Sequence, residues 1–332
     1  MAVEPGTIVL LNGTASSGKT SICRAFQDLM PTPWLNAGID RFLWMLPARY
    51  LDRPLWEEVM GLWDRPGEPG RVLISGMHRA VAALARSGNS VVADHVMVDP
   101  AWVRECAALF RDLPAWFVGV KVPLDLVVQR ERDRKDRTLG EAAKQFPLVH
   151  GAAAYDFEVD TSVFTASDAA DAIRDRITSG TPRAFWLLSL FEGAPRFVTR
   201  LLTASTEDPV AAAEDIALSM PETEQIELLN AHPRIGAAPG SVSEMSFREQ
   251  GYDRDPGTAE LQARLDRLND AYEARFGFRF VVFVAGRPRA EIADIMESKL
   301  TADRDEEKHR ALRDVVAIAR DRAHKLPVEE GP

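Results

Sequence analysis

The chain has 332 residues and a formal net charge of −10, with 50 acidic and 40 basic side chains. This length is sufficient for two cores, and the acid excess argues against a nucleic-acid-binding protein, because such proteins need clustered lysine and arginine to neutralise phosphates. Two cysteines, Cys23 and Cys106, make no disulfide framework and no metal-ligand spacing, and no stretch resembles a signal peptide or reaches the roughly 20 apolar residues of a membrane span. We therefore expect a cytoplasmic protein that acts on small molecules and binds neither nucleic acid nor membrane.

The N-terminal part of the chain, up to about residue 179, alternates short apolar runs with amphipathic helical patterns. Continuous apolar runs of this length between helices are typical of buried parallel strands. We predict a doubly wound α/β domain over residues 1–180. The apolar runs occupy residues 7–13, 89–96 and 115–122, and the helical patterns occupy residues 21–30 and 71–88.

A P-loop pattern begins at Gly13, where two glycines are separated by four residues and followed by lysine and threonine. It follows an apolar strand and opens a helix near Lys19, which is the context that this motif requires. The glycines permit a turn whose N–H groups face phosphate oxygens, Lys19 can reach the β- and γ-phosphates, and the Thr20 hydroxyl can ligate Mg²⁺. We predict that ATP and Mg²⁺ bind here. The expected nucleotide contacts are Gly13, Ser16, Ser17, Gly18, Lys19 and Thr20.

Two aspartates are candidates for the chemistry, because a P-loop alone does not distinguish a kinase from a GTPase or a regulatory ATPase. Asp40 follows a short apolar stretch that resembles the end of a second strand, where its carboxylate could accept a proton from a substrate hydroxyl. The same residue could instead cap the next helix, and its pattern leaves both interpretations open. Asp94 ends the apolar run at residues 90–93 and could hold Mg²⁺ through water.

A run of alternating charges covers residues 130–137. Its usual explanation is a solvated helix face with internal ion pairs. In a P-loop kinase, such a run is also where the arginines of a lid stabilise the phosphoryl group during transfer.

These motifs together resemble the chloramphenicol phosphotransferase family across nearly the whole N-terminal half. The resemblance implies a kinase that moves the γ-phosphate of ATP to a small-molecule hydroxyl, with Asp40 as the base and Arg134 and Arg137 near the phosphates. The region between Leu46 and Val72 diverges from the family's antibiotic kinase, so chloramphenicol is only one candidate acceptor. The residues that carry the resemblance are 8–19, 33–35, 38–40, 94, 116–120, 136–137, 143–145, 149–150 and 155–161.

The texture of the sequence changes after residues 179–182, and the remainder is mostly helical in pattern. Asp208 and Pro209 look like an N-cap and a first-turn proline, and Pro221 precedes another helix. We predict further helices over residues 261–276, 289–300 and 306–325. Residues 278–284 have the composition of a strand instead.

His232 is the strongest candidate for a catalytic residue in this second half. The adjacent Pro233 makes a rigid turn that can hold an imidazole exposed, with a pKa near neutral pH. A lone histidine is more often structural, and Glu249 is the companion that favours catalysis. The scattered histidines do not have the spacing of a zinc site, so we predict no metal here.

The second half, from residue 184 to about 326, resembles the decarboxylases of 2-oxo-4-hydroxy-4-carboxy-5-ureidoimidazoline (OHCU), which form (S)-allantoin in urate breakdown. The residues that carry this resemblance are 191–192, 194–195, 231–236, 246, 249–250, 268–269, 272, 275–278, 280–281, 318 and 322. The resemblance implies an all-helical domain over residues 184–327, with a frayed tail at 328–332, and it implies that residues 278–284 form a connection rather than a strand.

The same resemblance implies chemistry without a cofactor and assigns the site. His232 would handle a proton at the substrate hydroxyl, and Glu249 with Gln250 would bind polar groups of the ureido chain or ring. Arg322 would hold a carboxylate or enolate, since a planar fork suits that role, although Arg320 is an alternative. Substrate contacts are expected from Pro233, Gln250 and Ser246, the last of which could also be a helix N-cap.

The first hypothesis for the whole chain is a fusion of two enzymes, a small-molecule kinase and an OHCU decarboxylase. A second hypothesis makes the N-terminal half a nucleotide sensor that regulates the decarboxylase. A third makes the helical half a catalytically silent dimerisation domain, because amphipathic helices often form interfaces, and a homodimer is compatible with this arrangement.

Overall fold

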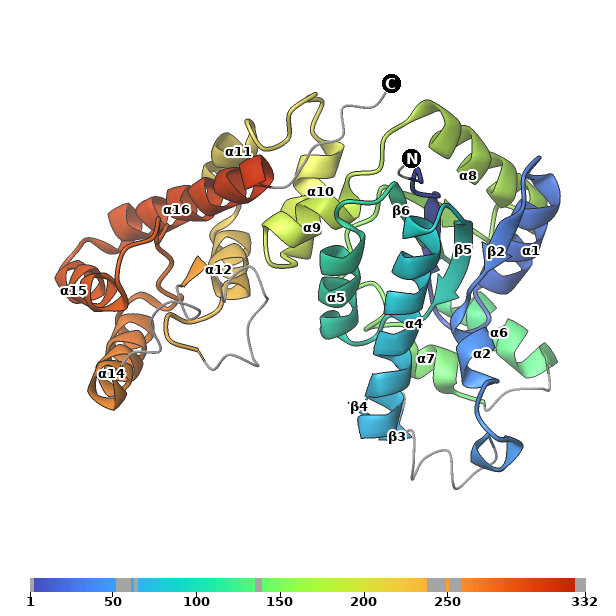
Figure 1. The fold of residues 1–332 in the computed structure, drawn as a ribbon, viewed down its shortest axis with the longest axis horizontal. Coiled ribbons are helices and arrows are strands. Elements are labelled where there is room, and N and C mark those ends of the chain that lie inside the picture. The colour runs from blue at the N-terminus through green and yellow to red at the C-terminus, as the bar shows by residue number, and fades with distance from the viewer. Residues whose placement is uncertain are drawn as a thin grey trace. The chain divides into compact units, whose positions relative to one another are not determined.

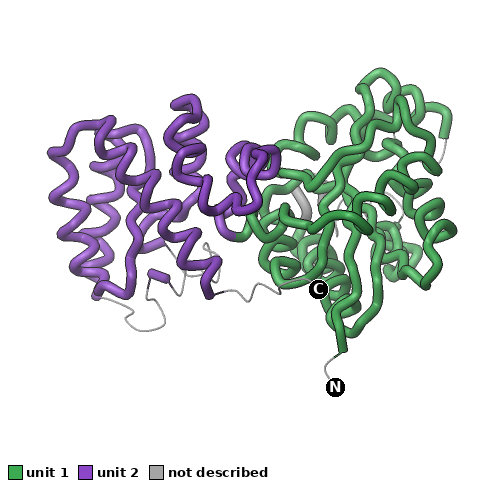
Figure 2. The backbone as a smooth tube through the Cα atoms, turned by 90° about the horizontal axis from the view of Figure 1, so that it is seen from above, with its two compact units in different colours: residues 1–189 green, residues 190–332 purple. Residues whose placement is uncertain are grey.

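The computed structural model describes residues 3–51, 61–62, 65–134, 139–237, 249–250 and 258–325. The chain forms two compact units, residues 1–189 and residues 190–332 (Figure 2). Arg137, Ser246 and the tail at 328–332 lie outside the described residues. Within the described ranges, no helix combines the length and the apolar character needed to cross a bilayer.

The first unit is built on a five-stranded sheet in the order β2-β5-β1-β6-β7, and all its strand pairs are parallel. The chain passes from β1 to one side of the sheet and later returns to the other side, so β1 is the switch point where ligands of such sheets bind. This confirms the predicted parallel α/β architecture. The strands are β1 (Ile8–Asn12), β2 (Trp34–Asn36), β5 (Ser90–His95), β6 (Ala115–Lys121) and β7 (Phe157–Asp160), with a separate pair, β3 (Gly61–Leu62) and β4 (Arg65–Pro66).

Helices flank this sheet (Figure 1). Side chains of α1 and α8, such as Phe26 and Ile173, form one core cluster with Val9, Val92 and Val118 of the strands. The apolar strand runs are buried because both faces of the sheet are covered, as the sequence predicts. The helices of this unit are α1 (Lys19–Leu29), α2 (Ile39–Leu43), η1 (Ala48–Tyr50), α4 (Glu68–Arg86), α5 (Pro100–Phe110), α6 (Leu124–Arg134), α7 (Glu141–Gln145), α8 (Ala166–Ser179) and α9 (Ala184–Leu190).

The start of α9 is fixed within the first unit by a buried carboxylate. Asp156 accepts hydrogen bonds from the N–H groups of Phe117, Arg183 and Ala184 at 2.7 to 2.9 Å, and burial raises the pKa of Asp156 to about 6. Phe185 then stacks on Phe117 with ring centroids 4.7 Å apart. The chain therefore leaves the sheet through an anchored turn.

The described residues of the second unit form helices and their connections, with no strand among them. Its predicted helices at Pro221, at residues 261–276 and near the C-terminus are confirmed, and Gly277 ends α14 with φ +79°. The helices are α10 (Pro195–Thr203), α11 (Ala213–Ser219), α12 (Glu222–Ala231), α14 (Ala259–Phe276), α15 (Arg289–Lys299) and α16 (Arg304–Lys325).

Residues 278–284 form no strand, so the prediction from composition is wrong and the one implied by resemblance is confirmed. Consecutive side chains of the segment are buried, for example Phe280 and Val281. In a strand with one buried face, buried and exposed side chains would alternate. Backbone carbonyls here are satisfied by arginine side chains: Arg310 donates to Val281 O at 2.9 Å. Strand-like residues are thus used to fill a helical core.

The helix predicted at Asp208 begins later than expected. Asp208 Oδ1 accepts hydrogen bonds of 3.0 Å from the N–H groups of Val210 and Ala211, as a cap would. These bonds close only a turn, and α11 starts at Ala213. The capping chemistry was identified correctly, but the position of the helix was not.

Candidate active sites

The P-loop joins the end of β1 to the start of α1. Gly18 is the N-cap of α1 with φ +95°, and Ser16 also has a positive φ of 60°. Gly13 lies against the neighbouring strand, because a Cβ there would be 2.6 Å from Val120 O. Both glycines of the motif are therefore required by the backbone, one by its conformation and one by close approach.

Lys19 is buried and folds back over this loop. Its Nζ donates to Gly13 O at 2.7 Å, to Thr14 O at 2.5 Å and to Ser17 Oγ at 3.3 Å. The ammonium group thus lies inside the turn whose N–H groups are expected to hold phosphates. The predicted residues Gly13, Ser16, Ser17, Gly18 and Lys19 are brought together.

Thr20 and Asp94 meet at the end of the sheet next to this loop. Thr20 Oγ1 donates a hydrogen bond of 2.7 Å to Asp94 Oδ2. Hydroxyl and carboxylate oxygens are the ligands that Mg²⁺ prefers in proteins. The two residues predicted to serve the metal are adjacent, although β5 and α1 are far apart in sequence.

Asp40 lies in the first turn of α2, and Gly38 rather than Asp40 is the N-cap of that helix. The capping interpretation of Asp40 is therefore wrong. Gly38 also packs tightly, because a Cβ at this position would be 1.8 Å from Asp94 Oδ1. The glycine lets α2 approach the Thr20–Asp94 pair and brings Asp40 to the same region.

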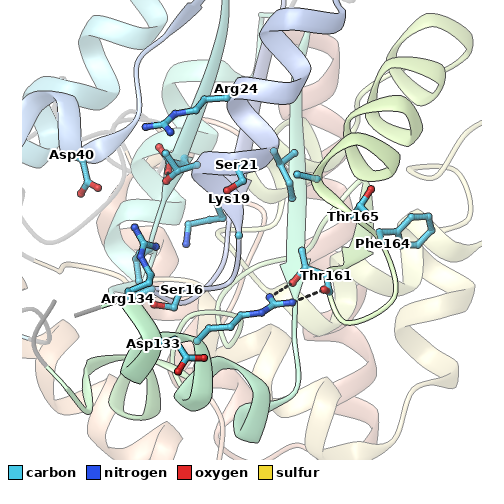
Figure 3. A pocket seen from close by; sticks show the side chains of 18 residues that line it. Ser16, Lys19, Ser21, Arg24, Asp40, Asp133, Arg134, Thr161, Phe164 and Thr165 are labelled. Carbon is cyan, nitrogen blue, oxygen red and sulfur yellow. Dashed lines mark hydrogen bonds between the residues drawn. The ribbon is translucent and has the colours of Figure 1, made fainter. Parts of the chain in front are cut away.

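A cavity of about 600 Å³ connects these groups, and Lys19, Thr20, Asp40, Asp94 and Arg134 all line it. Figure 3 shows Asp40 on one side of this space and Phe164 with Thr165 on the other, with Lys19 between them. The cavity therefore has a phosphate-binding centre with a carboxylate at one end and an aromatic side chain at the other.

The structure describes residues 130–134 of the charged run, and two of their side chains make hydrogen bonds within the first unit. Arg130 donates to Thr161 Oγ1 at 2.9 Å and to Thr161 O at 2.7 Å, and Thr161 Oγ1 donates to Ser17 O at 2.9 Å. Glu131 is buried and accepts hydrogen bonds from the N–H groups of Gly140 and Ala142. Residues 132–134 are exposed, and the role of the run as a lid stays a prediction.

A contact that sequence reasoning missed joins this region to the P-loop. Gln145 Oε1 accepts a hydrogen bond of 2.8 Å from the N–H of Ala15. Gln145 is one of the residues that carry the family resemblance, but an isolated glutamine gives no chemical signal in a sequence. Its role follows only from the position of α7 beside the loop.

The second unit places His232 at the C-terminal end of α12. The imidazole is buried, and its Nδ1 lies 3.4 Å from Leu228 O. Nε2 is also buried and has no hydrogen-bond partner among the described residues. Burial lowers the pKa of His232 to about 4, with Glu192 raising it and Arg322 lowering it. The ring is neutral near pH 7, and with the proton assigned to Nδ1 the lone pair of Nε2 can accept a proton.

Arg322 is buried beside this histidine and holds two carboxylates. Its Nε and Nη2 donate to the two oxygens of Glu249, each at 2.7 Å, and Nη2 lies 2.6 Å from Glu192 Oε1. Nη1 donates to Leu190 O at 2.9 Å. Burial alone would lower the pKa of Arg322, but the two carboxylates raise it above its usual range. Arg320 is instead half-exposed, 3.6 Å from Glu214.

Gln250 is buried beside the turn that follows His232, and its predicted role in substrate binding stays a prediction. Its Oε1 accepts from the Gly236 N–H at 3.1 Å, and its Nε2 donates to Arg234 O at 3.4 Å. Pro233 continues the same turn after α12. Gln250 therefore supports the backbone that follows His232.

Two family models match the chain in succession. The chloramphenicol phosphotransferase-like protein model matches residues 6–178, and the OHCU decarboxylase model matches residues 184–324. The chain belongs to both families. Both are families of enzymes, so the chain is a fusion of a phosphotransferase unit and a decarboxylase unit, as predicted.

Relatives agree with this division. The "Putative O-phosphotransferase Rv2636" of Mycobacterium tuberculosis is 34% identical over 183 residues, which are 51% of this chain and 81% of that protein. The OHCU decarboxylase of Halalkalicoccus jeotgali is 32% identical over 133 residues, 37% of this chain and 74% of that protein. A crystal structure of an OHCU decarboxylase in the presence of (S)-allantoin is similar at 24% identity and a TM-score of 0.36, covering 42% of this chain and 96% of that one.

Sequence reasoning also missed the contact of Glu192 with the buried Arg322. Glu192 carries part of the family resemblance but received no role, because a glutamate between two helices has no distinctive pattern. Its ion pair with Arg322 depends on a segment 130 positions away in the chain. The sequence did contain one indication of a tight turn here, which is Gly193. Both Glu192 and Gly193 have a positive φ in the structure.

Proposed function

We propose that the phosphotransferase unit transfers the γ-phosphoryl group of ATP to a hydroxyl group of a small molecule, with Asp40 as the base. The observation that carries this proposal is the single cavity lined by Asp40, Lys19 and the Thr20–Asp94 pair. In such a transfer the base accepts the hydroxyl proton as the oxygen attacks the γ-phosphorus, and the bond to the bridging oxygen of ADP breaks.

The remaining groups would stabilise charge during this step. The P-loop N–H groups and Lys19 would hold the β- and γ-phosphates, and Arg134 would lie near the group in transfer. Thr20 and Asp94 would hold Mg²⁺, directly or through water, and their adjacent oxygens fit that ion. The metal would neutralise charge on the phosphates.

Replacement of the base tests this proposal. We expect Asp40→Asn to bind ATP with unchanged heat in calorimetry, because the P-loop N–H groups and Lys19 are expected to hold the phosphates. We expect the same variant to lose phosphorylation across a panel of hydroxylated metabolites that includes chloramphenicol. If the wild-type chain phosphorylates none of them while nucleotides still alter decarboxylation in both proteins, the unit is a sensor instead.

We also propose that the decarboxylase unit converts OHCU to (S)-allantoin. The supporting observation is the buried Nε2 of His232 beside the carboxylates that Arg322 holds. The bond to the carboxylate carbon would break and its electron pair would enter the ring of the substrate, so no cofactor is needed. His232 Nε2 would accept the hydroxyl proton, and a proton would be added at the ring carbon.

Measurement of CO₂ release from freshly generated OHCU tests this second activity. The substrate decomposes in water, so the rate must be compared with His232→Ala and with His324→Ala, a change at an exposed histidine on α16. We expect loss only in the first variant. Equal rates in all three proteins would leave the helical unit as a silent domain, in which case its role could be dimerisation.

We place the domains at residues 1–180 and 184–327. The two family matches, which end at residue 178 and begin at residue 184, support this boundary. Helix α9 begins at the boundary, but its first residues pack within the first unit. Separate expression of the two halves should therefore be tried with α9 in either half.

A further inference from the structure

Glu192 adopts a backbone conformation that glutamate rarely takes. Its φ is +53°, and among the described residues only Ser16 and Ala285 share a positive φ without being glycine. A left-handed conformation is strained for a residue that carries a side chain. Strain of this kind persists where the surrounding structure requires the residue, so the side chain of Glu192 needs an explanation.

That side chain is buried against Arg322. The carboxylate of Glu192 is 8% exposed and lies 2.6 Å from Nη2, whereas the other carboxylate on the same guanidinium, that of Glu249, is 25% exposed. Taken by themselves, these two carboxylates and one guanidinium carry a net charge of −1. Such a cluster is poor at stabilising a fold, because burial of each charge is costly.

Glu192 and Arg322 also act electrostatically on His232. The carboxylate of Glu192 raises the pKa of this histidine, while burial, Arg322 and Arg279 lower it. If His232 Nε2 accepts the hydroxyl proton, an O–H bond breaks, an N–H bond forms, and a buried imidazolium results. The carboxylate of Glu192 would remain ionised and compensate that charge, while Arg322 holds it in place.

We infer that Glu192 is a positioning residue of the decarboxylase site, which fixes Arg322 from the interior and stabilises the imidazolium of His232. Glu249, on the more exposed side of the guanidinium, then faces the substrate. This inference rests on the proposed decarboxylase function and adds a residue to it.

Three substitutions distinguish the effect of the Glu192 carboxylate from the effect of its strained backbone. Glu192→Gln keeps the strained backbone and removes the charge, whereas Glu192→Gly relieves the strain and removes the charge. Ala285→Gly relieves strain at another left-handed residue without a change of charge. We expect both Glu192 variants to lose kcat for CO₂ release on the order of 100-fold, the usual scale for proton-transfer groups, with a much smaller change in KM. Ala285→Gly should match the wild type.

A Glu192→Gly variant with wild-type kcat would overturn the inference, because the residue would then serve only the turn. A rise in KM on the order of 100-fold with unchanged kcat in Glu192→Gln would also overturn the inference, since this result would assign Glu192 to substrate binding.

A readout without turnover separates this inference from the proposed function. The Nε–H proton of Arg322 should exchange slowly with solvent in NMR spectra of the wild-type chain, because the group is buried and hydrogen-bonded. We expect faster exchange in Glu192→Gln and no change in Ala285→Gly. If the wild type releases no CO₂, the proposed function fails; if exchange is the same in all three proteins, Glu192 does not fix Arg322.

Discussion

Thr20 Oγ1 donates a 2.7 Å hydrogen bond to Asp94 Oδ2, and this bond connects the first turn of α1 to the end of β5. The pair joins the P-loop to the strand that carries Asp94, the carboxylate predicted to hold Mg²⁺. The P-loop motif covers eight consecutive residues, but the oxygen that contacts its last residue, Thr20, comes from β5.

Removal of the hydroxyl from this pair should change the requirement for magnesium. We expect Thr20→Val to need roughly tenfold more Mg²⁺ for half-maximal phosphoryl transfer, the scale seen when a group supporting a metal is lost. Thr178→Val, an exposed threonine on α8, is the control. An unchanged magnesium dependence in Thr20→Val would remove Thr20 from the metal site.

Gly38→Ala should disable the kinase without a large loss of stability. The added methyl group would lie 1.8 Å from Asp94 Oδ1, so the carboxylate must move away from Thr20. We expect phosphoryl transfer to fall on the order of 100-fold, as when a single charge-stabilising group is lost. Gly76→Ala on α4, where a Cβ meets nothing within 4 Å, should keep full activity and raise the unfolding free energy by up to about 1 kcal/mol. Equal activities of both variants would contradict the close approach of α2 to Asp94.

Arg322→Lys should impair the decarboxylase, whereas Arg320→Lys should not. Lysine keeps the charge but lacks the planar fork that holds Glu249 through two hydrogen bonds. We expect a loss of about 2 kcal/mol in unfolding free energy for a buried pair left with worse geometry, together with loss of CO₂ release. Retained activity in Arg322→Lys, with loss in Arg320→Lys, would reverse the assignment of the active-site arginine.

The stability of the chain should fall in acid partly because of His232. Its pKa is about 4 in the folded chain and 6.5 as a reference, so the unfolded chain binds more protons between these values and the unfolding free energy rises with pH there. The contribution is present above pH 6.5 and is lost as the pH falls toward 4, by an amount on the order of 3 kcal/mol. Urea unfolding of wild type and His232→Gln at several pH values measures it. Parallel curves for the two proteins would show that the imidazole is not buried in its neutral form.

Local motifs allowed much of the phosphotransferase unit to be predicted. The P-loop is contiguous, so the conformations of Gly18 and Lys19 follow from neighbours in sequence, and the apolar strand runs follow from burial on both faces. Asp40 was less certain, because whether it caps α2 or faces a cavity depends on the approach of Gly38 to Asp94.

The decarboxylase unit was predicted mainly through its dispersed motif residues. Pattern reasoning misassigned residues 278–284, since apolar composition does not reveal that arginine side chains, rather than a neighbouring strand, satisfy the backbone. It also placed a helix at Asp208 from a cap that closes only a turn.

The sequence by itself determined the order of the two units, the phosphate-binding turn and the identity of the histidine, because these depend on residues close together in the chain. Only the tertiary structure decided that Glu192 and Glu249 share Arg322 and that Asp94 meets Thr20. Charges that are distant in sequence acquire their effect on one another only when folding removes the water between them.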